Sequence, residues 1–385
     1  MYISDLLYGS LGRIVATFSI IVIVLMMFLV SLRLYHSRRK KAYLSFAVSL
    51  LIIMIQYFLM SVWEISNHAM DTDSGYTAQL LQVVAFILMN MGIYQLYNAS
   101  RRREFVLFYF FLASTAVIGA LRFYFVRLEA EPTLQFLHFH NMWIEIYVLF
   151  LTFLSFYLIA PNVGQHIKYQ FSLTVYFLVQ AAHILNTYVM KQELAVFSVA
   201  ENFLPIIYYI TLFMIIFERV VELLQAVYTS AITDGLTGLF NRHYLINRIH
   251  QYVKEKKNIS LIFGDIDNFK KLNDTSGHQT GDKILKQVAR IMKEESEEVG
   301  IAGRYGGEEM VIVLTDTSLR VENLAERVRK RVEEETGITI SLGYSKYRNG
   351  ISAEELIKQA DQAMYHSKKT GKNKVTGFPQ KSLAH

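Results

Sequence analysis

Seven long apolar segments occupy the first half of the chain, and each approaches the roughly 20 residues that a helix needs to cross a bilayer. After residue 217 the pattern changes, and short apolar runs alternate with charged stretches. The pattern therefore predicts an N-terminal all-α membrane bundle followed by a soluble α/β domain. We expect the spans near residues 13–32, 43–62, 78–97, 105–126, 142–160, 170–189 and 199–217.

Basic residues are concentrated in alternate loops between these spans, nine on one side against three on the other. Because basic loops stay in the cytoplasm, the bias places the N-terminus outside and residues 218–385 inside. A cleaved signal peptide is not expected, because the first span lacks a basic segment before it. The nine are Arg33, Arg38, Arg39, Lys40, Lys41, Arg101, Arg102, Arg103 and Lys168; the three are Arg122, Arg127 and Lys191. One loop on the second side is acidic, with Glu64, Asp71 and Asp73.

Several polar side chains fall within the predicted spans. Ionisable groups in a membrane are costly and often functional, so these residues could bind a ligand, a metal ion or a proton. Hydrogen bonding between helices is the simpler interpretation, and the sequence names no ligand. They are His138, His140, Asn141 and Glu145 in the fifth span and His183 and Asn186 in the sixth.

The amino-acid composition excludes several kinds of site and binding function. The 385 residues include no cysteine, which excludes disulfides and thiolate metal sites. Residues 1–216 hold 13 of the 39 Lys and Arg and 10 of the 33 Asp and Glu, so the net charge of +6 is divided equally. Neither half is basic enough to predict nucleic-acid binding.

The last predicted span continues into residues 218–232 without proline or glycine. Apolar residues recur there in alternating steps of three and four, which is typical of a two-stranded coiled coil. The repeat covers only two heptads, so a single amphipathic helix packed on its own domain is an equal alternative. The positions are Phe217, Val220, Leu224, Val227 and Ala231.

Residues 233–378 have the pattern of one mixed α/β domain, followed by a tail at 379–385. We expect helices at 244–253, at 283–293 with Thr280 or Asp282 as the cap, around 324–332 and at 353–368. Strands are expected at 259–263, 301–305, 311–314 and 338–342, with a short strand near the end.

The segment Gly306-Gly307-Glu308-Glu309 joins two of these strands. Glycines without a Cβ let the backbone approach a ligand, and two neighbouring carboxylates can hold a divalent cation. An ordinary solvated turn remains an alternative for this motif taken alone. Asp265, at the end of an earlier strand, is the candidate partner acid.

Four sequence blocks follow one another within residues 230–378. The first two are Asp234…Thr237-Gly238-Leu239…Asn241-Arg242 and Asp265-Ile266-Asp267-Asn268-Phe269-Lys270…Asn273-Asp274…Gly277-His278…Gly281-Asp282. The others are Arg304-Tyr305-Gly306-Gly307-Glu308-Glu309 and Ala360-Asp361-Gln362-Ala363-Met364-Tyr365…Lys368…Gly371-Lys372-Asn373. Together, in this order, they resemble the GGDEF domain of diguanylate cyclases, here in a Gly-Gly-Glu-Glu-Met form.

The resemblance implies a fold like the palm of nucleotidyl cyclases and polymerases, and the condensation of two GTP into cyclic di-GMP with loss of two pyrophosphates. It implies that Asp265, Glu308 and the backbone carbonyl of Ile266 hold Mg²⁺, with Mn²⁺ as an alternative. Glu308 is also the implied base for the 3′-hydroxyl, although a metal-bound carboxylate is a weak base. Glu309 is a second carboxylate that binds metal or tunes Glu308.

The resemblance also implies the substrate contacts. Asn273 and Asp282 match positions that read guanine, and His278 matches a further substrate position. The backbone N–H groups of Asn268 and Phe269 would cradle the phosphates, and Lys368 and Lys372 would neutralise them. Local alternatives are that Asp267 and Asp274 are caps or turn residues without ligand contact, that His278 braces its loop, and that Lys271, Lys369 and Lys374 are solvated.

Two positions depart from the usual family pattern. Met310 replaces phenylalanine at the end of the hairpin motif, where we expect it on a buried face with little chemical effect. The Arg-x-x-Asp product-inhibition motif is replaced by Glu297-Glu298-Val299-Gly300, so we expect no product feedback at that site.

The prediction is a diguanylate cyclase in the bacterial cytoplasmic (inner) membrane, active as a homodimer because each domain supplies one GTP. The membrane region would sense an unknown ligand or position the soluble domain. The alternative is a catalytically inactive GGDEF module that serves as a nucleotide-binding or protein-interaction scaffold. A transporter with a regulatory domain is a weaker third hypothesis.

Overall fold

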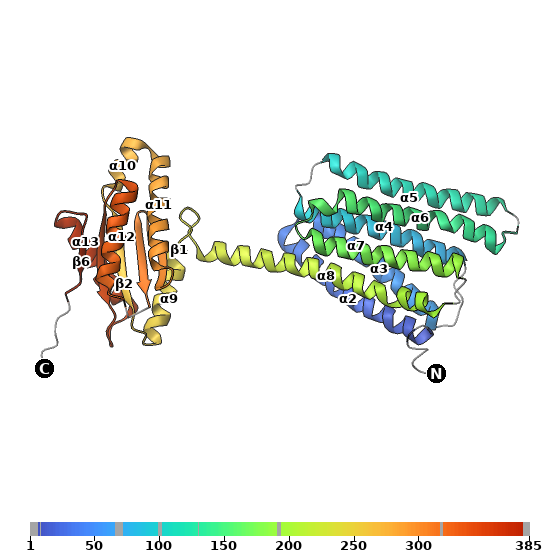
Figure 1. Cartoon of the computed structure of the whole chain (residues 1–385), viewed down its shortest axis with the longest axis horizontal. Coiled ribbons are helices and arrows are strands. Elements are labelled where there is room, and N and C mark those ends of the chain that lie inside the picture. Colours follow the sequence, from blue (N-terminus) through green and yellow to red (C-terminus); the bar gives the residue numbers. More distant parts are fainter. Residues whose placement is uncertain are drawn as a thin grey trace. The chain divides into compact units, whose positions relative to one another are not determined.

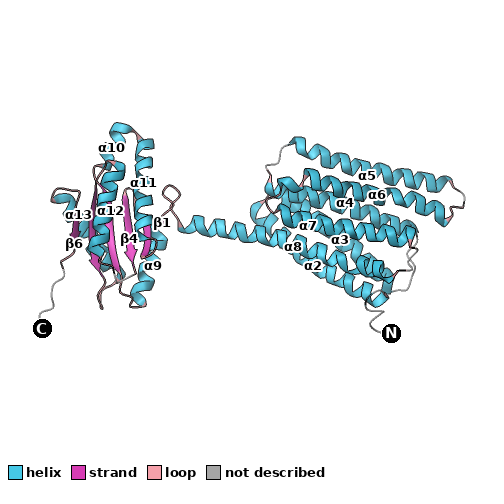
Figure 2. Ribbon diagram, viewed as in Figure 1, coloured by secondary structure: helices cyan, strands magenta, loops and turns pink. Residues whose placement is uncertain are grey.

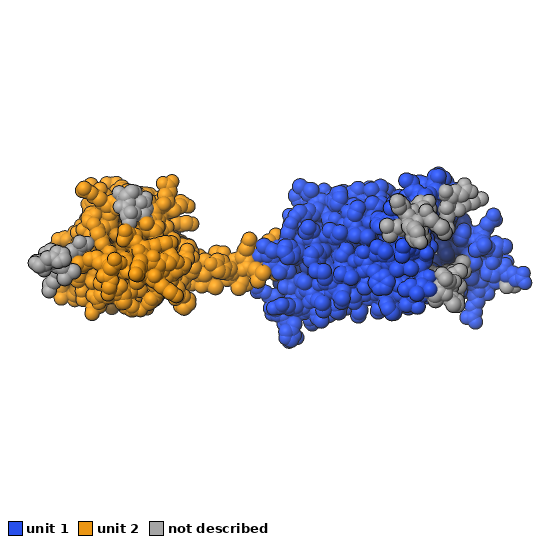
Figure 3. Space-filling view, turned by 90° about the horizontal axis from the view of Figure 1, so that it is seen from below, with its two compact units in different colours: residues 1–221 blue, residues 222–385 orange. Residues whose placement is uncertain are grey.

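The computed structural model describes residues 7, 9–65, 72–98, 102–129, 131–190, 194–315 and 319–379. The chain forms two compact units, residues 1–221 and residues 222–385 (Figure 3). Each unit has its own hydrophobic core. The division falls inside the segment predicted as a helical linker. The loop charges Asp71, Arg101 and Lys191 and residues 380–385 of the predicted tail lie outside the described residues.

Seven long helices make up the described part of the N-terminal unit, and each overlaps one predicted span (Figure 1). A short 3₁₀ turn, η1 (Ala160–Asn162), precedes α7, and a π-helical turn, η2 (Leu185–Val189), continues it. The helices are α2 (Ser10–Arg38), α3 (Lys41–Ile65), α4 (Thr72–Tyr97), α5 (Arg102–Leu128), α6 (Leu134–Leu158), α7 (His166–Ile184) and α8 (Ala195–Ile232).

Six of these helices are long and apolar enough to cross a membrane, counted over the residues that the structure describes. The exception is α7, which has 19 residues and includes Lys168, Gln170, Gln180 and His183. The prediction of seven helices is therefore confirmed for the described residues, whereas composition alone supports six spans. The polar side chains of α7 explain the difference.

Apolar side chains cover both the inside and the outside of this bundle. Large side chains such as Phe153 and Tyr157 of α6 point outward, and Leu50 and Ile144 are fully buried. Inside, polar groups pair between helices: the Tyr169 hydroxyl donates to Asn90 Oδ1. Such a bundle, hydrophobic all round with internal polar pairs, is typical of a membrane-embedded protein.

Helix α8 has 38 residues and ends at Ile232, directly before the sequence of the soluble domain. At 1.5 Å per residue it is about 57 Å long. Pro205 lies inside the helix, where it removes one backbone hydrogen bond. The predicted continuity from the last span through residue 231 is confirmed.

The C-terminal unit is built on a six-stranded sheet with the order β1-β3-β4-β2-β5-β6 (Figure 2). The central strand β2 pairs antiparallel with β4 and β5, and the outer strands β1 and β6 pair parallel with β3 and β5. The strands are β1 (Phe240–Asn241), β2 (Ser260–Ile266), β3 (Gly300–Arg304), β4 (Glu309–Leu314), β5 (Ile340–Lys346) and β6 (Val375–Gly377).

Alternation along the strands divides the core between two layers of helices. Leu261 and Phe263 of β2 pack with α9 (Arg242–Lys254) and α13 (Ala353–Lys369). The alternate residues Ile262 and Ile266 pack with α11 (His278–Ser296) and α12 (Val321–Thr336). Asp265 lies two residues after Phe263, so its side chain is on the same side of the sheet, the side covered by α13.

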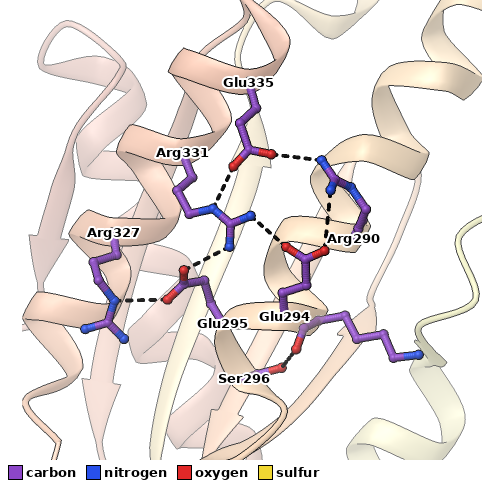
Figure 4. A network of polar contacts seen from close by, with 8 residues as sticks. Arg290, Glu294, Glu295, Ser296, Arg327, Arg331 and Glu335 are labelled. Atoms are coloured by element: carbon purple, nitrogen blue, oxygen red, sulfur yellow. Dashed lines mark hydrogen bonds and ion pairs between the residues drawn. The ribbon is translucent and has the colours of Figure 1, made fainter.

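A group of ion pairs holds α11 against α12 (Figure 4). The Arg331 guanidinium lies between Glu294 and Glu295 of α11 at 2.6 and 3.0 Å, and it also contacts Glu335 at 2.7 Å. Arg290 reaches from α11 to Glu335 at 2.8 Å. A network that shares its charges in this way stabilises a surface more than isolated pairs do.

Most predicted elements of this unit are confirmed, with three corrections. Helix α11 begins at His278, so neither Thr280 nor Asp282 is its cap. Gly277 is the N-cap, with φ of 80° and ψ of 159°. The short helix α10 (Phe269–Ser276), which was not predicted, lies before it. The strand predicted at 338–342 runs from Ile340 to Lys346.

Candidate active site

The Gly-Gly-Glu-Glu segment forms the turn between β3 and β4, as predicted. The Tyr305 N–H donates to the Glu309 carbonyl at 2.8 Å and closes the turn. A Cβ at Gly306 would come within 2.6 Å of Glu309 Oε2, so glycine is needed there to let this carboxylate lie against the backbone. The two acids are thus presented at the tip of a tight hairpin.

Arg304 fixes this hairpin to the beginning of the domain. Its Nε and Nη2 donate to the Gly307 carbonyl at 3.0 and 2.7 Å, and its Nη1 contacts Asp234 Oδ1 at 3.0 Å. Asp234 in turn accepts from the Thr237 hydroxyl at 2.6 Å. Burial alone would raise the pKa of Asp234, but hydrogen bonds from Thr237 and Arg304 outweigh it and lower that pKa. The planar guanidinium therefore links two segments that lie 70 residues apart.

Asp265 pairs with Glu309 in the β2–β4 ladder, and Glu308 directly precedes Glu309 in the sequence. The side chain of Asp265 is 8% exposed, and its carboxylate contacts Lys368 Nζ of α13 at 2.5 Å. The predicted site residues Asp265, Glu308, Glu309 and Lys368 are thus neighbours in the structure.

The carboxyl groups of these acids lie close enough together to repel one another when ionised. Burial raises the pKa of Asp265 to about 6, and repulsion from Glu308 and Glu309 adds to the effect, while Lys368 opposes it. The pKa of Glu309 is also raised, by burial and then by Asp361 and Glu308. Burial likewise raises the pKa of Asp361. Lys368 and, at Glu309, Arg242 therefore oppose four carboxyl groups, and this excess of negative charge favours a divalent cation.

No cluster of three or more His, Asp and Glu side chains with metal-binding spacing occurs in the described part of the chain. Magnesium does not require one, because it binds through one or two carboxylates and completes its shell with phosphate and water. Two carboxylates beside a strand end, in excess over their counter-charge, fit such a site. The predicted ligand Ile266 is the last residue of β2, next to Asp265.

The residues predicted to hold phosphates lie at the start of α10. Asn268 is its N-cap in a left-handed conformation, with φ of 57°, and Phe269 is its first residue. Lys372 Nζ donates to Asn268 Oδ1 at 2.6 Å, so these two predicted phosphate contacts are brought together. A helix N-terminus and an ammonium group at one place suit an anion.

The residues predicted to read guanine lie where α10 packs against α11. Asn273 Oδ1 is buried without a hydrogen-bond partner among the described residues. A Cβ on Gly281 would come within 2.0 Å of this oxygen, so the missing side chain makes room for the Asn273 amide. Asp282 follows Gly281 and is exposed. His278, exposed at the first position of α11, has no contact with the other predicted residues in the described structure.

Two neighbours of the site have structural roles. Asp267 is buried and accepts hydrogen bonds from the Thr339 and Ser341 hydroxyls, both at 2.7 Å, and from the Asn373 N–H at 3.0 Å. It therefore ties the loop of Lys372 to the sheet, in agreement with its interpretation as a turn residue. Met310 is fully buried in the core beneath α11 and α12, as expected.

Sequence reasoning gave no role to Asp361, Arg304 or Asp234, although all three belong to the quoted motifs. Asp361 lies near enough to Glu309 to raise its pKa, and the other two hold the hairpin. Their presence in the motifs was the available signal, but nothing in the spacing showed which side chains meet.

Comparison with known proteins agrees with this geometry. A family model described as "Diguanylate cyclase, GGDEF domain" matches residues 231–374. The C-terminal unit is therefore a GGDEF domain. It follows an N-terminal helical region whose six apolar helices fit a membrane sensor.

Among curated relatives, Diguanylate cyclase A of Treponema denticola is 38% identical over 161 residues, which cover 37% of this chain and 43% of that protein. Diguanylate cyclase DgcS of Shewanella oneidensis is 35% identical over 158 residues, covering 39% and 53%. The chain thus spans about half or less of the length of these relatives. A solved structure of the coiled coil and GGDEF domain of DgcB from Caulobacter crescentus, in complex with c-di-GMP, is 32% identical with a TM-score of 0.39. The match covers 42% of this chain and 92% of that one.

Proposed function

We propose that this protein is a membrane-bound diguanylate cyclase that condenses two GTP into cyclic di-GMP and two pyrophosphates. The observation that carries the proposal is the carboxylate group of Asp265, Glu308 and Glu309 beside Lys368, in a domain of the GGDEF family. The reaction forms two phosphodiester bonds, each by attack of a 3′-hydroxyl on the α-phosphate of the other GTP.

Asp265, Glu308 and the Ile266 carbonyl would hold Mg²⁺, with Mn²⁺ as the alternative. A bound divalent ion neutralises the triphosphate and lowers the pKa of the attacking hydroxyl. Glu308 then accepts the proton from the 3′-hydroxyl, and Glu309 adjusts the charge around it. Lys368 balances the carboxylates and, with Lys372, the phosphate oxygens.

The remaining predicted residues bind and orient GTP. Asn268 and Phe269 offer backbone N–H groups at the start of α10 to the β- and γ-phosphates. The Asn273 amide oxygen has no hydrogen-bond partner among the described residues, and Asp282 has an exposed carboxylate; both suit the donors of guanine. His278 is placed at the rim of the same helix pair as a further substrate contact.

The reaction requires two GGDEF domains facing each other, so we propose a homodimer joined along the C-terminal part of α8. The heptad positions there are open: Phe217 is 51% exposed, Leu224 63% and Val227 49%. Large apolar side chains at a/d spacing are stabilised by burial against the same face of a second copy. The coiled-coil interpretation is therefore favoured over packing on the chain's own domain.

We also propose the topology: seven spans in a bacterial cytoplasmic membrane, with the N-terminus outside and the GGDEF domain in the cytoplasm. Helix α7 supports seven crossings although its composition is polar. At its first turns Lys168 pairs with Glu218 of α8, and near its end His183 lies 3.4 Å from Glu201, 17 residues earlier in α8. It therefore runs along the bundle from one end to the other.

Product inhibition is expected to be absent. The motif positions Glu297-Glu298-Val299-Gly300 lie between the end of α11 and the first residue of β3, and they provide neither the arginine nor the aspartate of the inhibitory motif. Tight binding of cyclic di-GMP outside the active site of the purified protein would contradict this proposal.

The test is to incubate the full-length protein in detergent with GTP and Mg²⁺ and to measure cyclic di-GMP by mass spectrometry. Glu308→Ala should reduce the rate at least about a thousandfold, because it removes both the metal ligand and the base. Glu298→Ala, which removes an exposed glutamate of the same domain, should leave the rate unchanged. Retained activity in Glu308→Ala would refute the site. GTP binding without product in the unmodified protein would favour the scaffold alternative.

A further inference from the structure

A polar cavity lies inside the N-terminal unit, within the end of the bundle from which α8 starts. It has a volume of ≈ 560 Å³ and is lined by residues of α2, α3, α4, α6, α7, η2 and α8. This volume is in the range of about 300–1,000 Å³ that is typical of small-molecule sites. By the topology proposed above, this end of the bundle faces the outside of the cell.

The ionisable lining of the cavity is acidic. One arginine, Arg13, stands against three glutamates, Glu64, Glu145 and Glu201. Arg13 is already paired with Glu64 at 2.6 Å. Glu145 and Glu201 are left with His183 between them, whose ring nitrogens lie 3.5 and 3.4 Å from the two carboxylates. Even with a proton on that imidazole, the pair of glutamates keeps an excess negative charge.

Only one of the two carboxylate oxygens of Glu145 accepts hydrogen bonds from the described residues. It is 3% exposed, and its Oε1 accepts hydrogen bonds from Gln79 Nε2 at 2.9 Å and the Tyr188 hydroxyl at 3.0 Å. Its Oε2 is buried without a hydrogen-bond partner among the described residues. A buried carboxylate oxygen without a donor is costly, so this atom favours a ligand that brings a positively charged donor.

The size and the aromatic wall of the cavity suit an organic cation. Within the described ranges, no group of three His, Asp and Glu side chains has metal-binding spacing. The volume of the cavity is also far larger than a single ion. Tyr57 contributes aromatic surface to the wall, and such rings attract organic ammonium and guanidinium groups, as the Arg122 guanidinium over the Tyr76 ring, 4.7 Å from its centroid, illustrates.

We propose that this cavity binds a small organic cation, an ammonium or guanidinium compound, through Glu145 and Glu201. Helix α8 gives the site a direct route to the soluble domain. Glu201, Asn202 and Pro205 line the cavity, and the same helix continues to Ile232. A ligand bound to Glu201 therefore contacts the helix that carries the dimerisation face proposed above.

Binding can be measured on the full-length protein in detergent without relying on its enzymatic activity. Both tryptophans of the chain, Trp63 and Trp143, belong to the N-terminal unit, so tryptophan emission during heating reports the unfolding of this unit. The probes are two amines, tyramine and putrescine, each compared with a neutral analogue, 4-ethylphenol and 1,4-butanediol respectively.

We expect at least one amine to raise the midpoint of unfolding by about 3 °C at ten times its dissociation constant, and its neutral analogue to have no comparable effect. Glu145→Gln, which keeps the shape and removes the charge, should weaken the amine about tenfold or more. Glu201→Gln provides a second variant if the first does not fold. Glu129→Gln, an exposed glutamate outside the cavity, is the matched control and should bind as the unmodified protein does.

Two results would overturn the proposal. One is that neither amine stabilises the unit beyond its neutral analogue. The other is that Glu145→Gln or Glu201→Gln folds and binds the amine with unchanged affinity, since the charge of the cavity would then be irrelevant to the ligand.

Discussion

At the scale of single residues, the site is governed by how few positive charges face its carboxylates. Lys368 contacts Asp265 and also lowers the pKa values of Glu309 and Asp361, and Arg242 lowers that of Glu309, but burial and neighbouring acids outweigh these charges. Arg304 has a different task, because its guanidinium holds the hairpin in position without touching the predicted metal ligands.

The acidity of Asp265 predicts how the stability of the domain depends on pH. Its pKa is about 6 in the folded domain and 3.8 in the unfolded chain, so the folded state binds the proton more tightly. Its contribution to stability is thus fully present below pH 3.8 and is lost as the pH rises through about 6. In EDTA, Asp265→Asn should raise the free energy of unfolding of residues 222–385 by about 2 kcal/mol at pH 7.5. The gain should vanish near pH 4; urea titrations at the two pH values measure the difference.

Arg304→Lys should slow the cyclase by roughly tenfold to a hundredfold, because lysine cannot reach Asp234 and the Gly307 carbonyl together and the hairpin acids lose their position. The initial rate of cyclic di-GMP formation is the measurement. Arg320→Lys, an exposed arginine before α12, is the control. A rate in Arg304→Lys within about twofold of the unmodified protein would show that the guanidinium fork is dispensable.

At the scale of elements, the contact of α10 with α11 depends on one small residue. Gly281 lies inside α11, where alanine would normally favour the helix by about 1 kcal/mol. Here a Cβ would meet Asn273 Oδ1 at 2.0 Å, so the helix preference is opposed by a collision.

Gly281→Ala should therefore raise the KM for GTP about tenfold, because it displaces the amide that is proposed to contact guanine. Gly235→Ala serves as the control, since a Cβ there meets no atom within 4 Å. Steady-state kinetics of both variants compare them. An unchanged KM in Gly281→Ala would argue against guanine contact by Asn273.

Sequence predicts elements well where a long apolar run or an alternating strand decides them, as for α2 to α6 and for β2. It failed for α10, because this helix of eight residues buries one side chain, Phe269. It also misplaced the start of α11, since a glycine with positive φ begins that helix instead of a hydroxyl or carboxyl cap. For the site, motifs supplied the candidate acids. The contact between Arg304 and Asp234 joins distant segments, and no local pattern encodes it.

At the scale of the whole molecule, α8 belongs to both units, since it lines the cavity at one end and precedes the GGDEF domain at the other. Each residue of a helix adds about 100° of rotation, so the length of this helix sets the direction in which its apolar face points. Dimerisation through that face requires the apolar side chains to point in one particular direction around the helix axis.

Inserting two residues after Leu224 should turn the following part of the helix by about 200° and lower cyclase activity at least about tenfold. A seven-residue insertion that repeats the heptad should keep the rate within about threefold. Crosslinking at Val227→Cys, in a chain that has no other cysteine, would show whether the two faces still meet. Equal activity in both insertion variants would refute coupling through helix phase.

The ion pair between Lys368 and Asp265 also bears on the order of events during biosynthesis. Because Lys368 supplies a cation to the most buried acid of the candidate site, Asp265, folding does not require the proposed magnesium ion, unlike that of small zinc domains that stay unfolded without their metal. If the site binds Mg²⁺ together with the nucleotide as proposed, a cell starved of magnesium would hold folded but inactive molecules that regain activity when the ion returns.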